Sequence, residues 1–290
     1  MKTTFLEKLT SKRTRLKRLK DKIIVYFSGL SQDTIPEDQK VVIGYLKQHD
    51  IAIFPYAFPQ KYRASDIELF TDEKLNLYYT LWDGKKLYYK NGSRRARAQE
   101  YFNSLRLEQD EESPHRYLTH DFDVSENDIV VDIGAAEGNF SLSIIEKAKF
   151  VYLFEADKDW IEALRATFAP WQNKVKIIQK FVSDSTTGNM ITLDDFFTAG
   201  QTIDFIKADV EGAEGDVIRG ASKVIERQPN VKIAVCTYHR QEDADNLDAM
   251  LRSKGFTNKF SPGYMLYYYG KTNIVRAPFL RKAVLRAIKG

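Results

Sequence analysis

Acidic residues and a histidine follow two apolar segments in the second half of the chain. Asp209, Glu211 and Glu214 come directly after FIKA, and His239 closes the run CTYH. A neutral imidazole can remove a proton from a hydroxyl near pH 7, which predicts His239, Asp209 and Glu211 as catalytic residues. The same three side chains offer oxygen and nitrogen ligands to a divalent cation such as Mg²⁺ and are the candidate metal ligands. The plain alternatives are acids that favour a helix N-terminus and a histidine that caps a loop.

A glycine turn lies upstream, in the segment Asp132-Ile-Gly134-Ala135-Ala-Glu-Gly138. It follows the apolar run IVVDI and opens a helical segment, which is the context that a nucleotide-binding turn requires. A dinucleotide motif would also need glycine at positions 136 and 139, and neither has it. S-adenosylmethionine carries no phosphate, so the spacing favours this cofactor, with Asp132 placed to meet its ammonium group. We therefore predict that Asp132, Gly134, Ala135 and Gly138 bind S-adenosylmethionine.

Two further acids extend the predicted cofactor site. Glu155 ends the apolar run VYLFE, where a carboxylate can accept hydrogen bonds from both ribose hydroxyls. Asp184, in the loop SDSTTGN, is placed to accept from an adenine amino group, although Ser and Asp are also frequent turn formers. Asp209 lies at the same predicted sheet edge and is included among the cofactor contacts.

The elements that must position these residues begin near residue 128. The short apolar segments IVVDI, VYLFEA, KVKIIQKFV, IDFIKAD and VKIAVCTY alternate with segments that can form helices. Such alternation predicts a parallel sheet covered by helices on both faces. After a helix at 241–254, the segments GFTNKFS and GYMLYYYG predict two more strands and an antiparallel end. The fold class is α/β, a seven-stranded, mostly parallel Rossmann-like sheet with an N-terminal α+β extension.

The chain divides into four predicted segments. They are a basic amphipathic helix at 1–30, an α+β extension at 31–110, a cofactor-binding domain at 111–270 and a basic tail at 271–290. Within the extension we expect a helix followed by a short strand over 41–57, a hairpin around Asp83-Gly84, and a helix over 93–109 that Ser93 caps.

Positive charge is concentrated at the two ends. Residues 1–30 carry nine Lys or Arg against two acids, and residues 271–290 carry six against none, whereas the whole chain has a net charge of only +4. A nucleic-acid partner is not expected, because the charge does not lie on the predicted catalytic domain. Near the C-terminal end, an apolar stripe between basic residues is formed by Leu280, Val284 and Ile288. The apolar residues of the first predicted helix form a similar stripe at the other end. Both ends are predicted to rest on an anionic membrane surface, with packing against the body or in a homo-oligomer as the alternative.

The composition places the protein in the cytoplasm. No apolar run approaches the roughly 20 residues that a membrane-spanning helix needs, and no secretory signal is present. The single Cys236 cannot form an intrachain disulfide, which fits a reducing compartment. The expected location is therefore cytoplasmic, with peripheral contact at the inner membrane face.

The blocks VVDIGAAEGNFSL, FIKADVEGAEGDVIRGA and CTYHRQED resemble, in this order, the FkbM family of S-adenosylmethionine-dependent methyltransferases. The upstream segment SPHRYL also resembles this family, so the resemblance covers about 113–270. It implies a class I methyltransferase fold and methyl transfer to oxygen, frequently on a surface polysaccharide or an antibiotic. Within these blocks we expect Glu214, Tyr117 and Arg240 to contact the acceptor, a glycan or small molecule.

Two rival functions stay open at this point. A nicotinamide-dependent oxidoreductase could use a similar sheet, although the missing glycines argue against it. A catalytically idle scaffold that binds S-adenosylmethionine is the second rival. Calorimetry with S-adenosylhomocysteine and with NAD separates the first rival from a methyltransferase.

Overall fold

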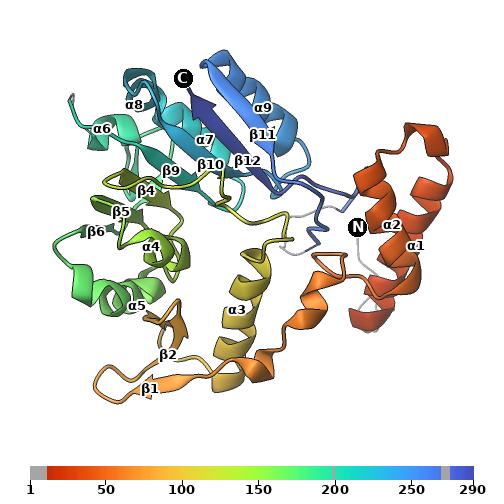
Figure 1. Cartoon of the computed structure of the whole chain (residues 1–290), viewed down its shortest axis with the longest axis horizontal. Coiled ribbons are helices and arrows are strands. Elements are labelled where there is room, and N and C mark those ends of the chain that lie inside the picture. The colour runs from red at the N-terminus through yellow and green to blue at the C-terminus, as the bar shows by residue number, and fades with distance from the viewer. Residues whose placement is uncertain (1–11, 198–199, 269–274) are drawn as a thin grey trace.

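The computed structural model describes residues 12–197, 200–268 and 275–290. Its centre is a seven-stranded sheet with the strand order β11-β12-β10-β9-β4-β5-β6 (Figure 1). The strands are β4 (Ile129–Ile133), β5 (Phe150–Phe154), β6 (Val175–Ile178), β9 (Phe205–Ala208), β10 (Lys232–Cys236), β11 (Phe256–Phe260) and β12 (Val284–Lys289). The neighbours from β10 to β6 are all parallel, and β12 runs antiparallel to both β10 and β11. The predicted mostly parallel sheet is confirmed.

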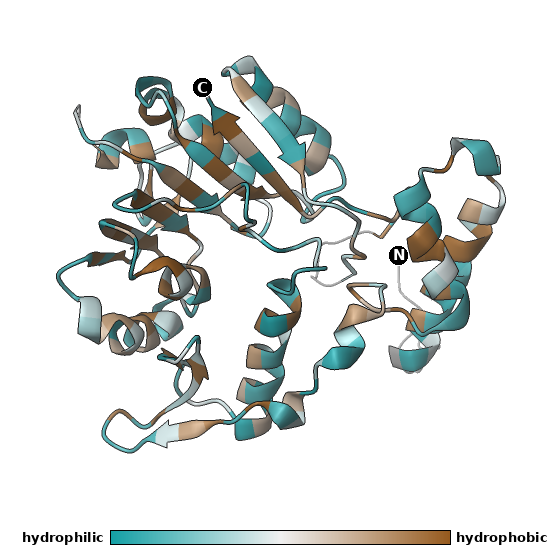
Figure 2. Ribbon diagram, viewed as in Figure 1, coloured by the Kyte–Doolittle hydropathy of each residue, from teal (hydrophilic) through white to brown (hydrophobic). Residues whose placement is uncertain are grey.

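Alternate residues of the central strands enter two separate hydrophobic cores. On β4, Val130 packs into one core and Val131 into the other, because successive side chains of a strand point to opposite faces. Both valines are fully buried, and Figure 2 shows the strands as brown bands between helices with teal outer faces. The helices of this domain are α4 (Asn139–Ile144), α5 (Lys158–Phe168), α6 (Leu193–Phe196), α7 (Glu214–Gly220), α8 (Ser222–Arg227) and α9 (Asp243–Ser253), with a 3-10 turn η5 (Ala169–Trp171).

The antiparallel strand is not where the sequence pattern placed it. The segment 263–268 forms no strand beyond a single bridge at Met265, and residues 269–270 lie outside the described ranges. The strand is β12, within the segment predicted as a basic tail, so the sheet extends past the predicted domain boundary at residue 270. Residues four apart share a face in a strand as well as in a helix. The apolar stripe of Leu280, Val284 and Ile288 is therefore compatible with either a strand or a helix.

The segment KVKIIQKFV, predicted as one strand, contributes to two sheets. Its first part is β6, and its end is β7 (Phe181–Val182), which pairs with β8 (Met190–Ile191) away from the main sheet. This break turns the chain over the carboxyl end of β5 and brings residues 180–182 to the site described below.

Two helices of the N-terminal extension form a third core of their own. Helix α1 (Lys12–Ser28) packs on α2 (Glu37–Gln48), with Ile23 and Leu46 fully buried between them (Figure 1). Leu266 and Leu280 belong to the same core, so this helical pair packs on the chain that leads into β12. Three short 3-10 turns follow or join these helices, η2 (Gln32–Thr34), η3 (Phe58–Lys61) and η4 (Ala64–Asp66). Residues 49–57 form no strand, so the predicted strand after α2 is wrong.

A three-stranded antiparallel sheet, which includes the predicted hairpin, and a helix lie between this helical pair and the main sheet along the chain. The strands are β1 (Phe70–Asp72), β2 (Leu77–Trp82) and β3 (Lys85–Tyr88), and the predicted turn at Asp83-Gly84 is confirmed. Helix α3 (Arg95–Glu108) confirms the predicted helix, but its cap is Arg94, which makes no side-chain capping bond, and not Ser93. Trp82 Nε1 donates to Ser143 Oγ of α4 at 2.8 Å, which fixes the hairpin to the glycine-turn helix.

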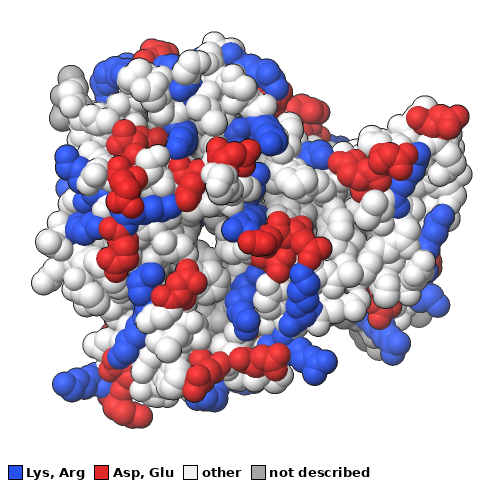
Figure 3. Space-filling model, in the orientation of Figure 1, with Lys and Arg blue, Asp and Glu red and all other residues white. Residues whose placement is uncertain are grey.

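The described surface gives limited support to the predicted membrane contact. None of the helices in the described ranges is both long and apolar enough to cross a membrane. Arg281 and Arg286 are only 5% and 6% exposed, so the second basic end does not present these charges to a surface. On the face drawn in Figure 3, acidic and basic side chains are interspersed. Contact through α1, and a homo-oligomer, stay predictions; residues 1–11 lie outside the described ranges.

Candidate active site

A cavity of about 380 Å³ lies at the carboxyl ends of β4, β5 and β9, and we call it the strand-end cavity. Open α/β sheets bind ligands at this edge. The wall combines the glycine turn, the end of β5, the β7 segment and the loop after β9. Its lining residues are Ile133, Gly134, Ala136, Phe154–Asp157, Trp160, Lys180–Val182 and Asp209–Glu211.

Gly134 is required by a close approach between two strand ends. Its φ is +72°, and a Cβ there would lie 2.0 Å from the carbonyl oxygen of Asp209. Gly138 has a different reason, because a Cβ there would lie 2.7 Å from the ring of Phe168 on α5. Gly134 therefore shapes the strand-end cavity, whereas Gly138 allows α4 and α5 to pack and lies outside the lining. Ala135 is likewise a buried turn residue that does not line the cavity.

Glu155 is held by the backbone at the end of β5. Its two carboxylate oxygens accept from Ala136 N at 2.8 Å and from Asp157 N at 2.6 Å. Burial raises the pKa of Glu155, and these two N–H groups offset part of that effect. The side chain lines the strand-end cavity in a fixed orientation, with each oxygen keeping a further lone pair.

Asp132 does not reach the strand-end cavity. The side chain is fully buried, forms an ion pair with Lys207 Nζ at 3.0 Å, and accepts from Ser141 Oγ at 2.7 Å. Lys207 also donates to the carbonyl of Gly134 at 2.8 Å. The structure thus gives Asp132 a position beneath the glycine turn, where it neutralises a buried lysine, and does not bring it to the place predicted for an ammonium group.

Asp184 also lies outside the strand-end cavity. It is exposed and pairs with Arg219 Nε at 3.3 Å. Lys180, Phe181 and Val182 line the cavity in its place, because β7 turns away from the main sheet.

Asp209 is the centre of a group of buried polar side chains that we call the Asp209 cluster. The predicted meeting of Asp209 and His239 at one sheet edge is observed, with Nε2 of His239 3.5 Å from Oδ1 of Asp209. Tyr117 donates to Oδ2 at 2.8 Å and Tyr238 to Oδ1 at 3.4 Å. His115 Nε2 lies 3.7 Å from Oδ2. Burial would raise the pKa of Asp209, but the nearby charges of His239, His115 and Lys207 lower it to about 2.

His239 lies between two carboxylates. Its Nδ1 is 2.8 Å from Glu214 Oε1, and Glu214 is only 1% exposed. Glu214 Oε1 also accepts from Val210 N at 3.0 Å, which fixes the carboxylate in place. Burial would lower the pKa of His239, but Glu214 and Asp209 outweigh it and raise the pKa above its ordinary value. The imidazole therefore holds a proton more strongly than a free histidine.

The other predicted residues lie at different depths. Glu211 is exposed, lines the strand-end cavity and has a φ of +55°, but it does not join the Asp209 cluster. Arg240 is exposed and lines a separate depression beside α7 and α9. Glu214 is buried behind His239, so it does not face a substrate directly. Tyr117 is 5% exposed and donates to Asp209, and its contact with the acceptor stays a prediction.

Sequence reasoning missed three members of the site. His115 lies in SPHRYL and is buried, and burial lowers its pKa to about 4, so it is neutral at pH 7. Tyr238 precedes the predicted base. Lys207 is a cation in the middle of the buried strand FIKA, and a lysine in such a position must have an anionic partner. This last signal was present in the sequence.

The strand order, with one antiparallel strand between β10 and β11, is that of the class I methyltransferase fold. The sequence model of the family described as the methyltransferase FkbM domain matches residues 111–257, about half of the chain. The chain belongs to this family of S-adenosylmethionine-dependent methyltransferases. The resemblance predicted from the sequence blocks is confirmed, and the oxidoreductase rival is set aside.

Several solved structures are similar to this chain at low identity. A methyltransferase FkbM from Methylobacillus flagellatus is 15% identical, with a TM-score of 0.49 over 94% of this chain; this chain spans only 59% of that protein. A protein from Streptococcus mutans solved in complex with S-adenosylhomocysteine is 17% identical over 57% of this chain and 90% of its own, with a TM-score of 0.38. An rRNA methylase from Streptococcus thermophilus has the same TM-score, 0.38, with 15% identity over 57% of this chain and 89% of its own. A search of curated proteins finds no match.

Proposed function

We propose that this protein transfers a methyl group from S-adenosylmethionine to a hydroxyl of a sugar, in a surface glycan or a secondary metabolite. The observation that carries the proposal is the position of Asp209. Asp209 lines the strand-end cavity, and its carboxylate is the centre of the Asp209 cluster, so a residue that can orient a hydroxyl lies beside the place proposed for the methyl donor.

The strand-end cavity has the groups that this cofactor needs. Glu155, fixed by two backbone N–H groups, would accept from the two ribose hydroxyls, and Gly134 lines the wall proposed for the amino-acid end. Phe181 and Val182 would offer apolar surface to the adenine. The sequence analysis had instead expected Asp184 to contact the adenine, by accepting from its amino group. Asp132 and Gly138 support the turn from behind, by the Lys207 ion pair and by packing on α5.

The acceptor hydroxyl is proposed to lose its proton to the pair Asp209–His239. S-adenosylmethionine, when bound, supplies a methyl group on a positive sulfur, which passes in line to the acceptor oxygen. Asp209 is the more exposed member, with 19% of its side chain accessible against 5% for His239, and it accepts the hydroxyl hydrogen bond. A carboxylate with a pKa of about 2 does not keep a proton, whereas the raised pKa of His239 makes its deprotonated imidazole the stronger base, so His239 is the final base.

A divalent cation is a second arrangement that the cluster can support, with a changed set of ligands. Asp209, Glu214 and His239 offer ligand atoms that all lie within 4.8 Å of one another, whereas Glu211 is not part of this group. Glu214 Oε2 is buried without a hydrogen-bond partner among the described residues. A cation such as Mg²⁺ would act there as a Lewis acid toward the acceptor oxygen.

The experiment combines binding with turnover. We expect calorimetry to show binding of S-adenosylhomocysteine and none of NAD. Incubation of S-adenosylmethionine with a panel of nucleotide sugars and methyl glycosides is expected to give S-adenosylhomocysteine and an O-methyl signal in the NMR spectrum of the product. Transfer to nitrogen or carbon would contradict the proposal, and binding without turnover would favour the idle scaffold. Activity that is lost on chelation and restored by Mg²⁺ would establish the cation.

A further inference from the structure

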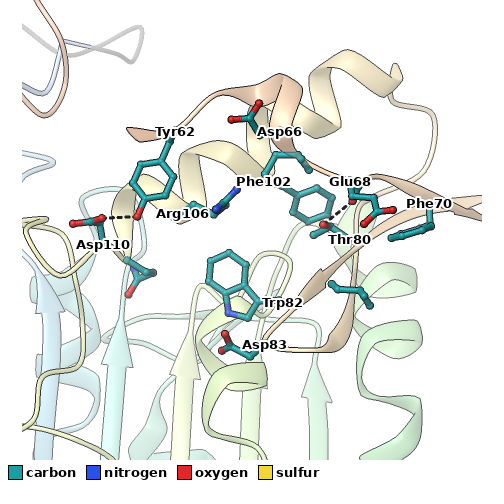
Figure 4. A pocket seen from close by; sticks show the side chains of 13 residues that line it. Tyr62, Asp66, Glu68, Phe70, Thr80, Trp82, Asp83, Phe102, Arg106 and Asp110 are labelled. Carbon is teal, nitrogen blue, oxygen red and sulfur yellow. Dashed lines mark hydrogen bonds between the residues drawn. The ribbon is translucent and has the colours of Figure 1, made fainter. Parts of the chain in front are cut away.

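A second cavity, of about 450 Å³, lies in the N-terminal extension, and we call it the hairpin cavity. It is enclosed by the turn η4, the strands β1 and β2, and the last turns of α3 (Figure 4). Figure 4 shows Trp82 in the middle of the pocket, with Tyr62 and Asp110 on one side and Thr80, Glu68 and Phe70 on the other. The volume is within the range of small-molecule sites.

The lining combines aromatic rings with both acceptors and donors of hydrogen bonds. Trp82 is half-buried, and the edge of its indole is fixed because Nε1 donates to Ser143. The carboxylates of Glu68 and Asp83 are exposed and make no hydrogen bond to any residue in the described ranges. Arg106, whose guanidinium lies 5.2 Å from the ring centre of Tyr62, supplies donors on the facing wall.

The hairpin cavity is linked to the Asp209 cluster through one residue, Gln109. Gln109 lines the cavity, and its Oε1 accepts from Tyr117 N at 3.3 Å. The hydroxyl of the same Tyr117 donates to Asp209. Gln109 Nε2 is buried with no hydrogen-bond partner among the described residues, so it is an unsatisfied donor behind the surface of this wall. On the other side, Trp82 contacts α4, the helix that the glycine turn opens.

We infer that the hairpin cavity binds an uncharged sugar ring of the methyl acceptor, next to the residue that is methylated. This inference rests on the methyl transfer proposed above. The C–H face of a pyranose packs on an aromatic plane such as Trp82, and its hydroxyls both donate to carboxylates and accept from a guanidinium. An anionic ligand does not fit, because Asp66, Glu68, Asp83 and Asp110 outnumber the single cation Arg106. A cationic ligand is the alternative, because these acids would attract it, while Arg106 on the same wall would repel it.

Saturation-transfer NMR on the full chain, with S-adenosylhomocysteine present, tests this assignment. The probes are methyl glycosides of glucose, rhamnose and glucuronic acid, together with spermidine as the cationic alternative. We expect ring protons of the neutral glycosides to receive saturation, with affinity about tenfold lower in Trp82→Ala and nearly retained in Trp82→Phe. Tyr45→Ala, an aromatic truncation on α2, is the matched control and is expected to leave the signal unchanged.

A pair of charge variants separates the two ligand classes. Glu68→Gln and Asp83→Asn keep an oxygen acceptor, so binding of a neutral sugar is expected to change by less than about threefold, whereas a cation would lose about tenfold. Saturation of spermidine or of glucuronide alone, or a glycoside signal that Trp82→Ala leaves intact, overturns the inference. Calorimetry of S-adenosylhomocysteine on the same samples tests the proposed function separately. If the unmodified chain did not bind S-adenosylhomocysteine, the proposed methyl transfer would be wrong, whereas the result would not bear on sugar binding in the hairpin cavity.

Discussion

The two sides of the site at the sheet edge are built by different means. On the proposed cofactor side, the shape comes from the backbone: a left-handed Gly134 against the Asp209 carbonyl, and N–H groups that fix Glu155. On the proposed acceptor side, the shape comes from buried ionisable side chains that balance one another, with His239 between Asp209 and Glu214. The first side should therefore respond to changes of backbone geometry, and the second to changes of charge.

The largest effect is expected from removing the central charge of the acceptor side. Asp209→Asn keeps the size of the side chain but leaves His239 and Lys207 with one fewer anionic partner. We expect the rate of methyl transfer to fall by about 100-fold, in the range of general acid–base contributions, with binding of S-adenosylhomocysteine weakened less than tenfold. The rate of S-adenosylhomocysteine formation and calorimetry measure the two quantities.

Asp245→Asn serves as the control for that experiment, since Asp245 is exposed on α9 and outside both cavities. If Asp209→Asn lowered binding and turnover by the same factor, the division between the two sides would be wrong.

A smaller effect is expected from Gly134→Ala, and it concerns cofactor binding rather than the rate of methyl transfer. A methyl group there meets the Asp209 carbonyl at 2.0 Å and also strains a φ of +72°, so the strand ends must separate. We expect a loss of about 3 kcal/mol in the free energy of unfolding and at least tenfold weaker binding of S-adenosylhomocysteine. Gly92 has a φ of +74° with nothing within 4 Å, so Gly92→Ala isolates the backbone strain, at about 1 kcal/mol.

The smallest effect is the dependence of stability on pH that His239 contributes on the acceptor side. The folded-state pKa of His239 is raised, so the stabilisation from its protonated form is fully present below about pH 6.5, the ordinary histidine value. It is lost as the pH rises through the raised folded value. Urea unfolding of the natural chain and of His239→Asn between pH 5.5 and 9 should show a difference that shrinks with rising pH. A difference that stays constant or grows would contradict the charge balance.

The backbone of the cofactor side was predictable from the sequence, because the glycine turn and Glu155 are close together along the chain, but four residues predicted there do not line the cavity: Asp132, Ala135, Gly138 and Asp184. The glycine turn and Glu155 belong to consecutive elements, and local rules for turns and strand ends suffice to bring them together. Asp132 and Gly138 show the limit of such rules. Both lie in the expected turn, but which atoms face the cavity depends on Lys207 and on Phe168, which come from other parts of the sheet and from α5.

The acceptor side was only partly predictable, because its residues come from segments that are far apart along the chain. The order of parallel strands implied that Asp209 and His239 would meet, and they do. His115 and Gln109 come from the segment before the first strand of the sheet, and no periodicity shows where that segment returns to the strand ends. Burial then decides the chemistry of His115, whose pKa it lowers to about 4, whereas Glu214 and Asp209 raise the pKa of His239.

The position of β12 between β10 and β11 also bears on how the chain can fold. On one side of β12, Val284 pairs with Cys236 of β10. On the other side, Leu285 pairs with Phe260 of β11, which is much nearer in sequence. Strand β11 therefore has no neighbour in the sheet until a later part of the chain has arrived between it and β10. Pairings between distant residues close long loops and form slowly, so this edge of the sheet is expected to assemble last, after the parallel strands that carry Gly134 and Asp209.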